Sequence, residues 1–155
     1  MPNYRRWRVP GGCYFFTVNL LNRSQRLLIE HIGLLRAAFR EVREAHPFTI
    51  DAIVILPDHL HATWTLPPGD ENFSMRWRQI KSAFSRALPK GESRSRSRRN
   101  HNERGIWQRR FYEHVIRDDD DYAAHVDSAH FNPVKHGHAA RPIDWPYSSL
   151  HRSIR

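Results

Sequence analysis

The stretch Pro57-Asp58-His59-Leu60-His61-Ala62-Thr63-Trp64-Thr65-Leu66 alternates between polar and apolar side chains from His59 onward. Successive side chains of a strand point to opposite faces of its sheet, so this alternation predicts a strand with one face on an apolar core. Both histidines fall on the other face, where two neighbouring imidazoles can hold one metal ion. An H-x-H pair by itself is weak support, because two histidines at a protein surface are a common alternative.

The length and charge of the chain favour one domain with a polyanionic partner. Its 155 residues are enough for one sizeable core, so we expect a single domain over 1–155. The 25 Lys and Arg outnumber the 16 Asp and Glu and leave a formal net charge of +9. Nucleic acid is the preferred partner, with a merely soluble basic protein as the alternative. No apolar run has the length of a transmembrane helix, so we expect no membrane association.

Cysteine usage and the N-terminus point to a reducing compartment. Cys13 is the one cysteine of the sequence and cannot form an internal disulfide. The first residues lack the apolar core of a secretory signal. We therefore expect a cytoplasmic protein in which Cys13 fills a small space in the core.

Hydrophobic spacing and turn signals predict six further elements around the histidine strand. They are a strand over 14–20, a helix over 32–45, a strand over 49–56, a basic amphipathic helix over 73–88, a strand over 107–116, and a helix that opens at the acidic run 118–121 and ends at Asn132-Pro133. The order β-α-β-β-α-β predicts an α+β, ferredoxin-like split βαβ sandwich, with an antiparallel sheet and two helices on one face. The additional C-terminal helix is expected on the other face, beside the histidines.

The segment 91–105, GESRSRSRRNHNERG, is polar, basic and of low complexity. Such a composition predicts a mobile loop, which could be a phosphate-binding arm or an idle linker. Other basic residues gather near aromatic ones, and they are expected to contact the DNA backbone without reading its sequence. Trp7 is expected to stack on an unpaired base. The full set of expected DNA-binding residues is Arg5, Arg6, Trp7, Arg8, Arg76, Arg78, Lys81, Arg94, Arg96, Arg98 and Arg99.

A set of motifs spread in order over nearly the whole chain resembles one family. They include Tyr4-Arg5-Arg6, Gly11-Gly12, Phe16-Thr17-Val18-Asn19-Leu20, Leu56-Pro57-Asp58-His59-Leu60-His61, Ile106-Trp107-Gln108, Asn132-Pro133-Val134-Lys135-His136-Gly137 and Asp144-Trp145-Pro146. With them the chain resembles the IS200-like, HUH-type single-tyrosine transposases, and more closely the REP-associated tyrosine transposases.

The resemblance implies a ferredoxin-like domain that cleaves and rejoins single-stranded DNA beside a hairpin, using Mg²⁺ or Mn²⁺. It implies that His59, His61 and Asn132 are the metal ligands. The family nucleophile is a tyrosine four residues before that asparagine, and here the position holds Ser128. An aliphatic hydroxyl is much harder to ionise than a phenol, so we expect cleavage to be impaired.

Two alternatives stay open at this stage. Tyr112, in the preceding strand, is a second choice for the nucleophile. The chain could also be a non-catalytic protein that binds hairpin DNA and keeps only the fold. A monomer and a homodimer are both compatible with the sequence.

Overall fold

The computed structural model describes residues 8–92, 94–101 and 103–153. The fold contains one antiparallel four-stranded sheet with the strand order β2-β3-β1-β4. The strands are β1 (Cys13–Asn19), β2 (Thr49–Ile55), β3 (His59–Thr65) and β4 (Tyr112–Val115). This order confirms the ferredoxin-like α+β fold.

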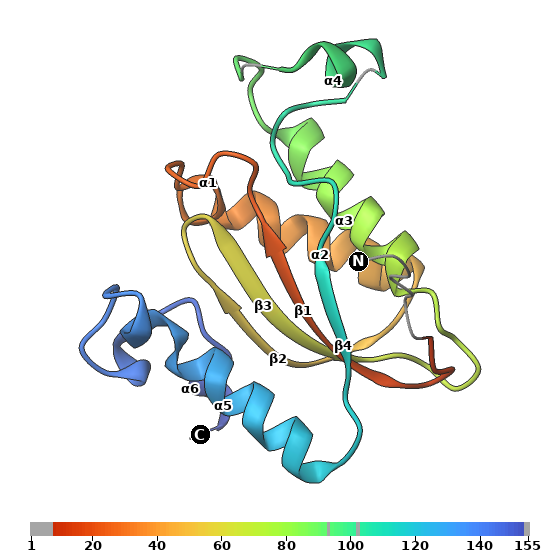
Figure 1. The fold of residues 1–155 in the computed structure, drawn as a ribbon, viewed down its shortest axis with the longest axis vertical. Helices are drawn as coiled ribbons and strands as arrows, with labels where there is room; N and C mark the ends of the chain where they lie inside the picture. The colour runs from red at the N-terminus through yellow and green to blue at the C-terminus, as the bar shows by residue number, and fades with distance from the viewer. Residues whose placement is uncertain (1–7, 93, 102, 154–155) are drawn as a thin grey trace, which may run out of the picture.

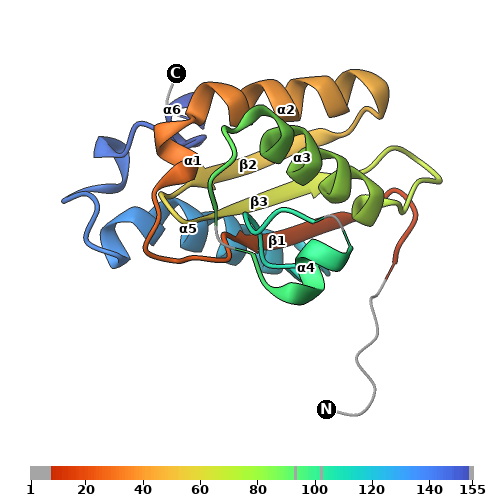
Figure 2. The same cartoon turned by 90° about the horizontal axis from the view of Figure 1, so that it is seen from above.

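Helices cover both faces of the sheet. On one face lie α2 (Ile32–Ala45) and α3 (Phe73–Ala87), and α5 (Asp119–Lys135) lies on the other, as Figures 1 and 2 show. Short helical segments connect these layers: α1 (Leu27–Glu30), α4 (Arg96–Asn100), η1 (Pro142–Asp144) and α6 (Leu150–Ser153). Among the described residues, none of these helices has the length and apolar character needed to span a bilayer.

The larger core fills the space between the sheet and the helix pair α2 and α3. The apolar residues of the alternating stretch in β3 face it, as the sequence predicted: Leu60, Ala62 and Trp64 are almost fully buried. Trp64 stacks on Trp77 of α3 with ring centroids 4.2 Å apart. Burial of such large side chains contributes roughly 1.5–3 kcal/mol each, so this layer dominates the stability of the fold.

A smaller core lies under α5, on the histidine face of the sheet. It joins Phe15, Val54, Leu56, Ala129 and Trp145. The Trp145 indole N–H donates to the Ile55 carbonyl at 2.8 Å, which ties the segment after α5 to the sheet. This layer fixes the height of α5 above the histidines.

Three elements differ from the sequence prediction. Helix α5 runs through Pro133 to Lys135 instead of ending at Asn132. Proline removes one backbone donor, but the next turn still forms, because the His136 N–H donates to the Asn132 carbonyl at 3.0 Å. The helix then ends before Gly137, whose φ of 76° is accessible to glycine without strain.

The strand expected over 107–116 is shorter, because Trp107 makes only an isolated bridge to Leu20 before the chain re-enters the sheet at Tyr112. Inside the expected loop 91–105, the five-residue helix α4 forms. Its N-cap is Ser95, whose hydroxyl accepts from the Arg98 N–H at 3.2 Å.

Candidate metal centre and nucleic-acid groove

The register of the sheet places both histidines of the H-x-H pair on the α5 face. His61 lies opposite Thr17 of β1, and Thr17 lies opposite Tyr112 of β4. His59 lies opposite Asn19 at the end of β1. Residues opposite each other in antiparallel strands share a face, so these side chains form two neighbouring rows beneath α5.

His61 is held by a hydroxyl on the next strand. Its Nδ1 lies 2.9 Å from Thr17 Oγ1, and its ring stacks on Phe15 with centroids 5.6 Å apart. The other ring nitrogen, Nε2, is buried and has no hydrogen-bond partner among the described residues. Burial lowers the pKa of His61 to about 4, with nearby His59 adding to the effect and Asn132 opposing it. The imidazole is therefore neutral at pH 7, as a metal ligand must be.

His59 is held by a carboxylate. Its Nδ1 lies 2.9 Å from Asp58 Oδ1, and Arg23 donates to the other oxygen of the same carboxyl group. Burial lowers the pKa of His59, although Asp58 opposes the shift. A carboxylate on Nδ1 fixes the tautomer with the lone pair on Nε2, which is a common arrangement around metal-binding histidines. The rings of His59 and His61 are 5.0 Å apart.

Helix α5 brings a third polar group to this pair. Asn132 is 8% exposed, and its Oδ1 is buried without a hydrogen-bond partner among the described residues. The carboxamide approaches His61 closely enough to affect the pKa of that ring. Two neutral imidazoles and an amide oxygen fit a divalent cation, and two of these groups have buried polar atoms without a hydrogen-bond partner among the described residues. The donor set leaves further coordination positions open.

A residue to which the sequence analysis gave no role also lies at this point. The ring of His136 is 5.4 Å from that of His59, and its side chain is exposed. The sequence signal was the spacing of four residues between Asn132 and His136, which places both on one side of a helix.

A second cluster that could hold a metal lies under the first turns of α5. The ligand atoms of His114, Asp121 and His125 are within 4.8 Å of one another. The rings of His114 and His125 are stacked, with centroids 4.4 Å apart and planes at 19°. Lone pairs in nearly parallel planes do not converge on one ion, so this arrangement needs a ring rotation before it could bind metal.

In the structure these three residues are joined by hydrogen bonds. Asp121 accepts from the backbone N–H of Arg117 at 2.9 Å and contacts His114 Nε2 at 2.9 Å and His125 Nδ1 at 3.0 Å. The hydrogen bond from the Arg117 backbone N–H is the largest effect that lowers the pKa of Asp121 to about 2, and the hydrogen bond with His114 adds to it. The cluster thus fixes the start of α5 to β4.

The two candidate nucleophiles occupy different elements. Ser128 is exposed on α5, one turn before Asn132. Tyr112 is 55% exposed on β4, and its ring is 6.4 Å from that of Phe15. Since Tyr112 shares a row with His61 across β1, its Cα is about 10 Å from that of His61, two strand spacings away.

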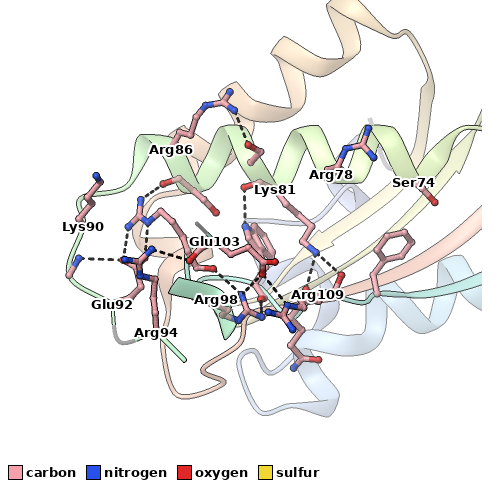
Figure 3. Close-up of a pocket in the computed structure, with 17 residues that line it drawn as sticks. Ser74, Arg78, Lys81, Arg86, Lys90, Glu92, Arg94, Arg98, Glu103 and Arg109 are labelled. Atoms are coloured by element: carbon pink, nitrogen blue, oxygen red, sulfur yellow. Dashed lines mark hydrogen bonds and ion pairs between the residues drawn. The ribbon is translucent and has the colours of Figure 1, made fainter. Parts of the chain in front are cut away.

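A basic groove lies between α3 and the described residues of the segment 90–109, with a volume of about 990 Å³ (Figure 3). Of the expected DNA contacts, Arg78, Lys81, Arg94 and Arg98 line it. The wall formed by the segment is anchored by Arg104, which donates to both carboxylate oxygens of Glu92 at 2.7 Å. Hydrogen bonds from Arg104 lower the pKa of Glu92 to about 2.

Two of the expected DNA contacts, Arg76 and Arg98, are buried, and their guanidinium groups hold parts of the fold together. Arg76 is 2% exposed and binds Asp70 with both terminal nitrogens, at 3.0 and 2.8 Å. It also donates to the carbonyls of His46 and Pro47. Arg98 is 8% exposed and donates to the carbonyls of Arg104 and Trp107.

The other expected contacts differ in their accessibility. Lys81 is half-buried and donates to the Gln108 carbonyl at 2.8 Å, and Arg94 is half-buried and donates to the Glu103 carbonyl. Arg8, Arg78, Arg96 and Arg99 are exposed. Arg5, Arg6 and Trp7 lie outside the described residues.

Comparison with known proteins finds full-length relatives, although no family model matches. A REP-associated tyrosine transposase from Escherichia coli strain K12 is 46% identical over 154 residues, which are 99% of this chain and 86% of that protein. A protein from Haemophilus influenzae, provisionally assigned to the same group, is 47% identical over 157 residues, with 100% and 89% coverage.

Solved structures agree with this result. A REP-associated tyrosine transposase bound to a REP hairpin has a TM-score of 0.85 and 45% identity, and the match covers 99% of this chain and 86% of that one. A protein from Deinococcus radiodurans, provisionally described as a transposase, has a TM-score of 0.51 and 16% identity, with 90% and 99% coverage. The latter similarity concerns the fold alone.

Proposed function

This chain belongs to the REP-associated tyrosine transposases, and from that premise we propose that it is a single-domain protein that binds hairpin DNA with an unpaired flank. The proposal is supported by a relative of 45% identity whose structure contains a REP hairpin. It is also supported by the formal charge of +9 and by the basic groove beside α3. Phosphate contacts from lysine and arginine supply most of the affinity for such a partner.

The metal site of the proposed function consists of His59, His61 and Asn132. The observation that carries it is a pair of buried polar atoms, His61 Nε2 and Asn132 Oδ1, that have no hydrogen-bond partner among the described residues and lie next to the carboxylate-held His59. A bound Mg²⁺ or Mn²⁺ would polarise a phosphodiester and stabilise charge on its oxygens. Asp58 and Thr17 would keep the two imidazoles oriented toward it.

The nucleophile is the part of this function that the chain lacks at the family position. Ser128 has an aliphatic hydroxyl, which is harder to deprotonate than a phenol of pKa about 10 and a poorer leaving group in the reverse step. Its side chain is also shorter than that of tyrosine by the length of the ring. We therefore propose that DNA cleavage and rejoining are impaired in this chain, while hairpin and metal binding remain.

A second candidate function follows from the position of Tyr112. This phenol lies on the same face as the histidines and is more than half exposed. If it replaced the missing nucleophile, the chain would cleave DNA through a phosphotyrosine on β4 instead of α5. A protein that only binds hairpins is the outcome if neither hydroxyl reacts.

A cleavage assay on a single-stranded hairpin substrate with Mn²⁺ separates these cases. The unchanged chain, Ser128→Tyr, Ser128→Ala and Tyr112→Phe are compared, and covalent protein–DNA adducts are detected on denaturing gels. We expect no adduct from the unchanged chain or from Ser128→Ala, and an adduct from Ser128→Tyr. An adduct that disappears in Tyr112→Phe supports the second candidate. If Ser128→Tyr forms no adduct but still binds the hairpin, the result favours a protein that binds hairpin DNA without cleaving it.

A further inference from the structure

A second groove, with a volume of about 680 Å³, lies where α2 passes the strand β2 and the C-terminal segment 146–152. Figure 2 shows α2 beside β2 at this edge of the sheet. This β2 groove shares no lining residue with the basic groove beside α3. We propose that the β2 groove binds an acidic peptide segment of a partner protein. The apolar side chains of the peptide lie on its floor, and the carboxylates meet its arginine rim.

The rim of the β2 groove carries four exposed arginines. Arg36, Arg40 and Arg43 follow one another at helical spacing along one side of α2, over about 10 Å, and Arg152 lies on the opposite wall. The one carboxylate residue that lines the groove is Glu44, and no ion pair joins it to these arginines in the described part of the chain. Four cations beside one carboxylate favour an anionic ligand.

Two of these arginines are held in place by aromatic rings. The guanidinium group of Arg36 lies over the ring of Tyr147, 5.9 Å from its centroid, and that of Arg43 lies over Phe48 at 5.6 Å. The Arg43 Nε also donates to the Phe48 carbonyl at 3.2 Å. A guanidinium group that stacks on a ring still directs N–H groups outward in its own plane, where a carboxylate accepts from two of them.

The floor of the β2 groove is apolar and offers no flat ring for a nucleobase. Ile50 and Ile53 are half-buried on β2. Phe39 and Phe48 also line the groove, but they are only 6% and 5% exposed. Proteins that bind unpaired nucleic acid stack bases on exposed aromatic rings. Branched aliphatic side chains instead accommodate the apolar side chains of a peptide, so the floor favours a peptide over DNA.

The edge of β2 is open along its first half. β2 is the last strand of the sheet, and only the segment 147–149 pairs with its outer edge in the described part of the chain. The Ile55 N–H donates to the Tyr147 carbonyl at 2.9 Å, and the Ser149 N–H donates to the Ile53 carbonyl at 2.8 Å. Residues 49–51 therefore leave an edge to which an extended peptide can add, since a peptide both donates and accepts backbone hydrogen bonds. A phosphate backbone only accepts them.

Peptide binding to the full chain tests this proposal. Fluorescence anisotropy follows a labelled peptide in which glutamate alternates with isoleucine and phenylalanine. Arg36→Ala/Arg40→Ala should weaken its binding about 4- to 25-fold, since each exposed ion pair contributes a factor of roughly two to five. A peptide with serine in place of the isoleucine and phenylalanine should bind the unchanged protein about tenfold more weakly or worse. In nuclear magnetic resonance titrations, the amide signals of residues 49–53 should shift when the peptide binds, because new backbone hydrogen bonds form there.

A matched control removes the same charge from the basic groove. Arg78 and Arg86 are exposed on α3, and Arg78→Ala/Arg86→Ala should change the peptide affinity by less than about twofold, because distant charges are screened. Equal losses in the two double variants would reduce the effect to net charge and overturn the proposal. No binding of the acidic peptide at about 1 mM would also overturn it.

Two further outcomes would assign the β2 groove to another ligand. If Arg36→Ala/Arg40→Ala weakens a labelled DNA hairpin as much as it weakens the peptide, the groove is a DNA contact. If the unchanged protein forms a dimer in sedimentation and the same variant abolishes it, the occupant is a second copy. A chain with a formal charge of +9 repels a second copy of itself, so we expect no such dimer. Either outcome would overturn the proposal.

Discussion

Acidification should destabilise this protein through His61. In the folded chain burial lowers the pKa of this imidazole to about 4, against an ordinary value of 6.5. In the unfolded chain His61 therefore becomes protonated below pH 6.5, whereas in the folded chain it stays neutral until about pH 4. The contribution of His61 is complete above pH 6.5 and is lost as the pH falls through this window.

The size of the effect follows from the two pKa values. At pH 5, protonation of this one residue lowers the free energy of unfolding by about 2 kcal/mol. The loss reaches about 3.4 kcal/mol at a pH low enough for His61 to be protonated in both the folded and the unfolded state. Burial also lowers the pKa of His59 and of His130, so the unchanged protein loses more than this. The comparison that isolates His61 is therefore with His61→Gln, which cannot titrate.

Urea unfolding in metal-free buffer at pH 7.5 and pH 5 measures the difference. The free energy of unfolding should fall by about 2 kcal/mol more in the unchanged protein than in His61→Gln. The same loss in both proteins would refute the account of His61 as a neutral, buried imidazole. A gain in the stability of the unchanged protein at pH 5 would contradict the sign of the argument.

Three further predictions concern the contacts around the site. Asp58→Asn should weaken Mn²⁺ binding about 10- to 100-fold in calorimetry, because the Asp58 carboxylate orients His59. The control Asp51→Asn loses a carboxylate that is bound to Thr65, and it should leave Mn²⁺ binding unchanged. Arg76→Met should lower the free energy of unfolding by about 3 kcal/mol, because Asp70 and two carbonyls lose their buried donor. The control Arg78→Met should change the free energy of unfolding by less than about 0.5 kcal/mol. Similar values for both variants would contradict the structural role of Arg76. Ser149→Ala should cost about 1–3 kcal/mol in urea unfolding, since the Ser149 hydroxyl accepts from the Ile53 N–H and contacts His130, and an unchanged midpoint would show that this contact is dispensable.

The elements that the sequence predicted well are those with strong local patterns. The alternation in 59–66 assigned the faces of β3, because a period of two leaves only one way to bury Leu60, Ala62 and Trp64. The end of α5 was predicted one turn too early, since a proline disfavours helix in the residue before it without forbidding it.

Charge alone did not predict which cations are exposed. Arg76 and Arg78 are two residues apart on a basic helix, yet one is buried against Asp70 and the other is exposed. Composition gives the number of cations, but only packing decides which of them reach solvent. For the same reason, the sequence did not indicate that Asp121 is a partner of His114.

The position of the divalent cation is the central claim of this account. Crystals of the protein soaked with Mn²⁺, with diffraction recorded at a wavelength where manganese scatters anomalously, locate it directly. The account predicts one peak among His59 Nε2, His61 Nε2 and Asn132 Oδ1, about 2.2 Å from each. A peak between His114, Asp121 and His125 with none at the H-x-H pair would contradict it.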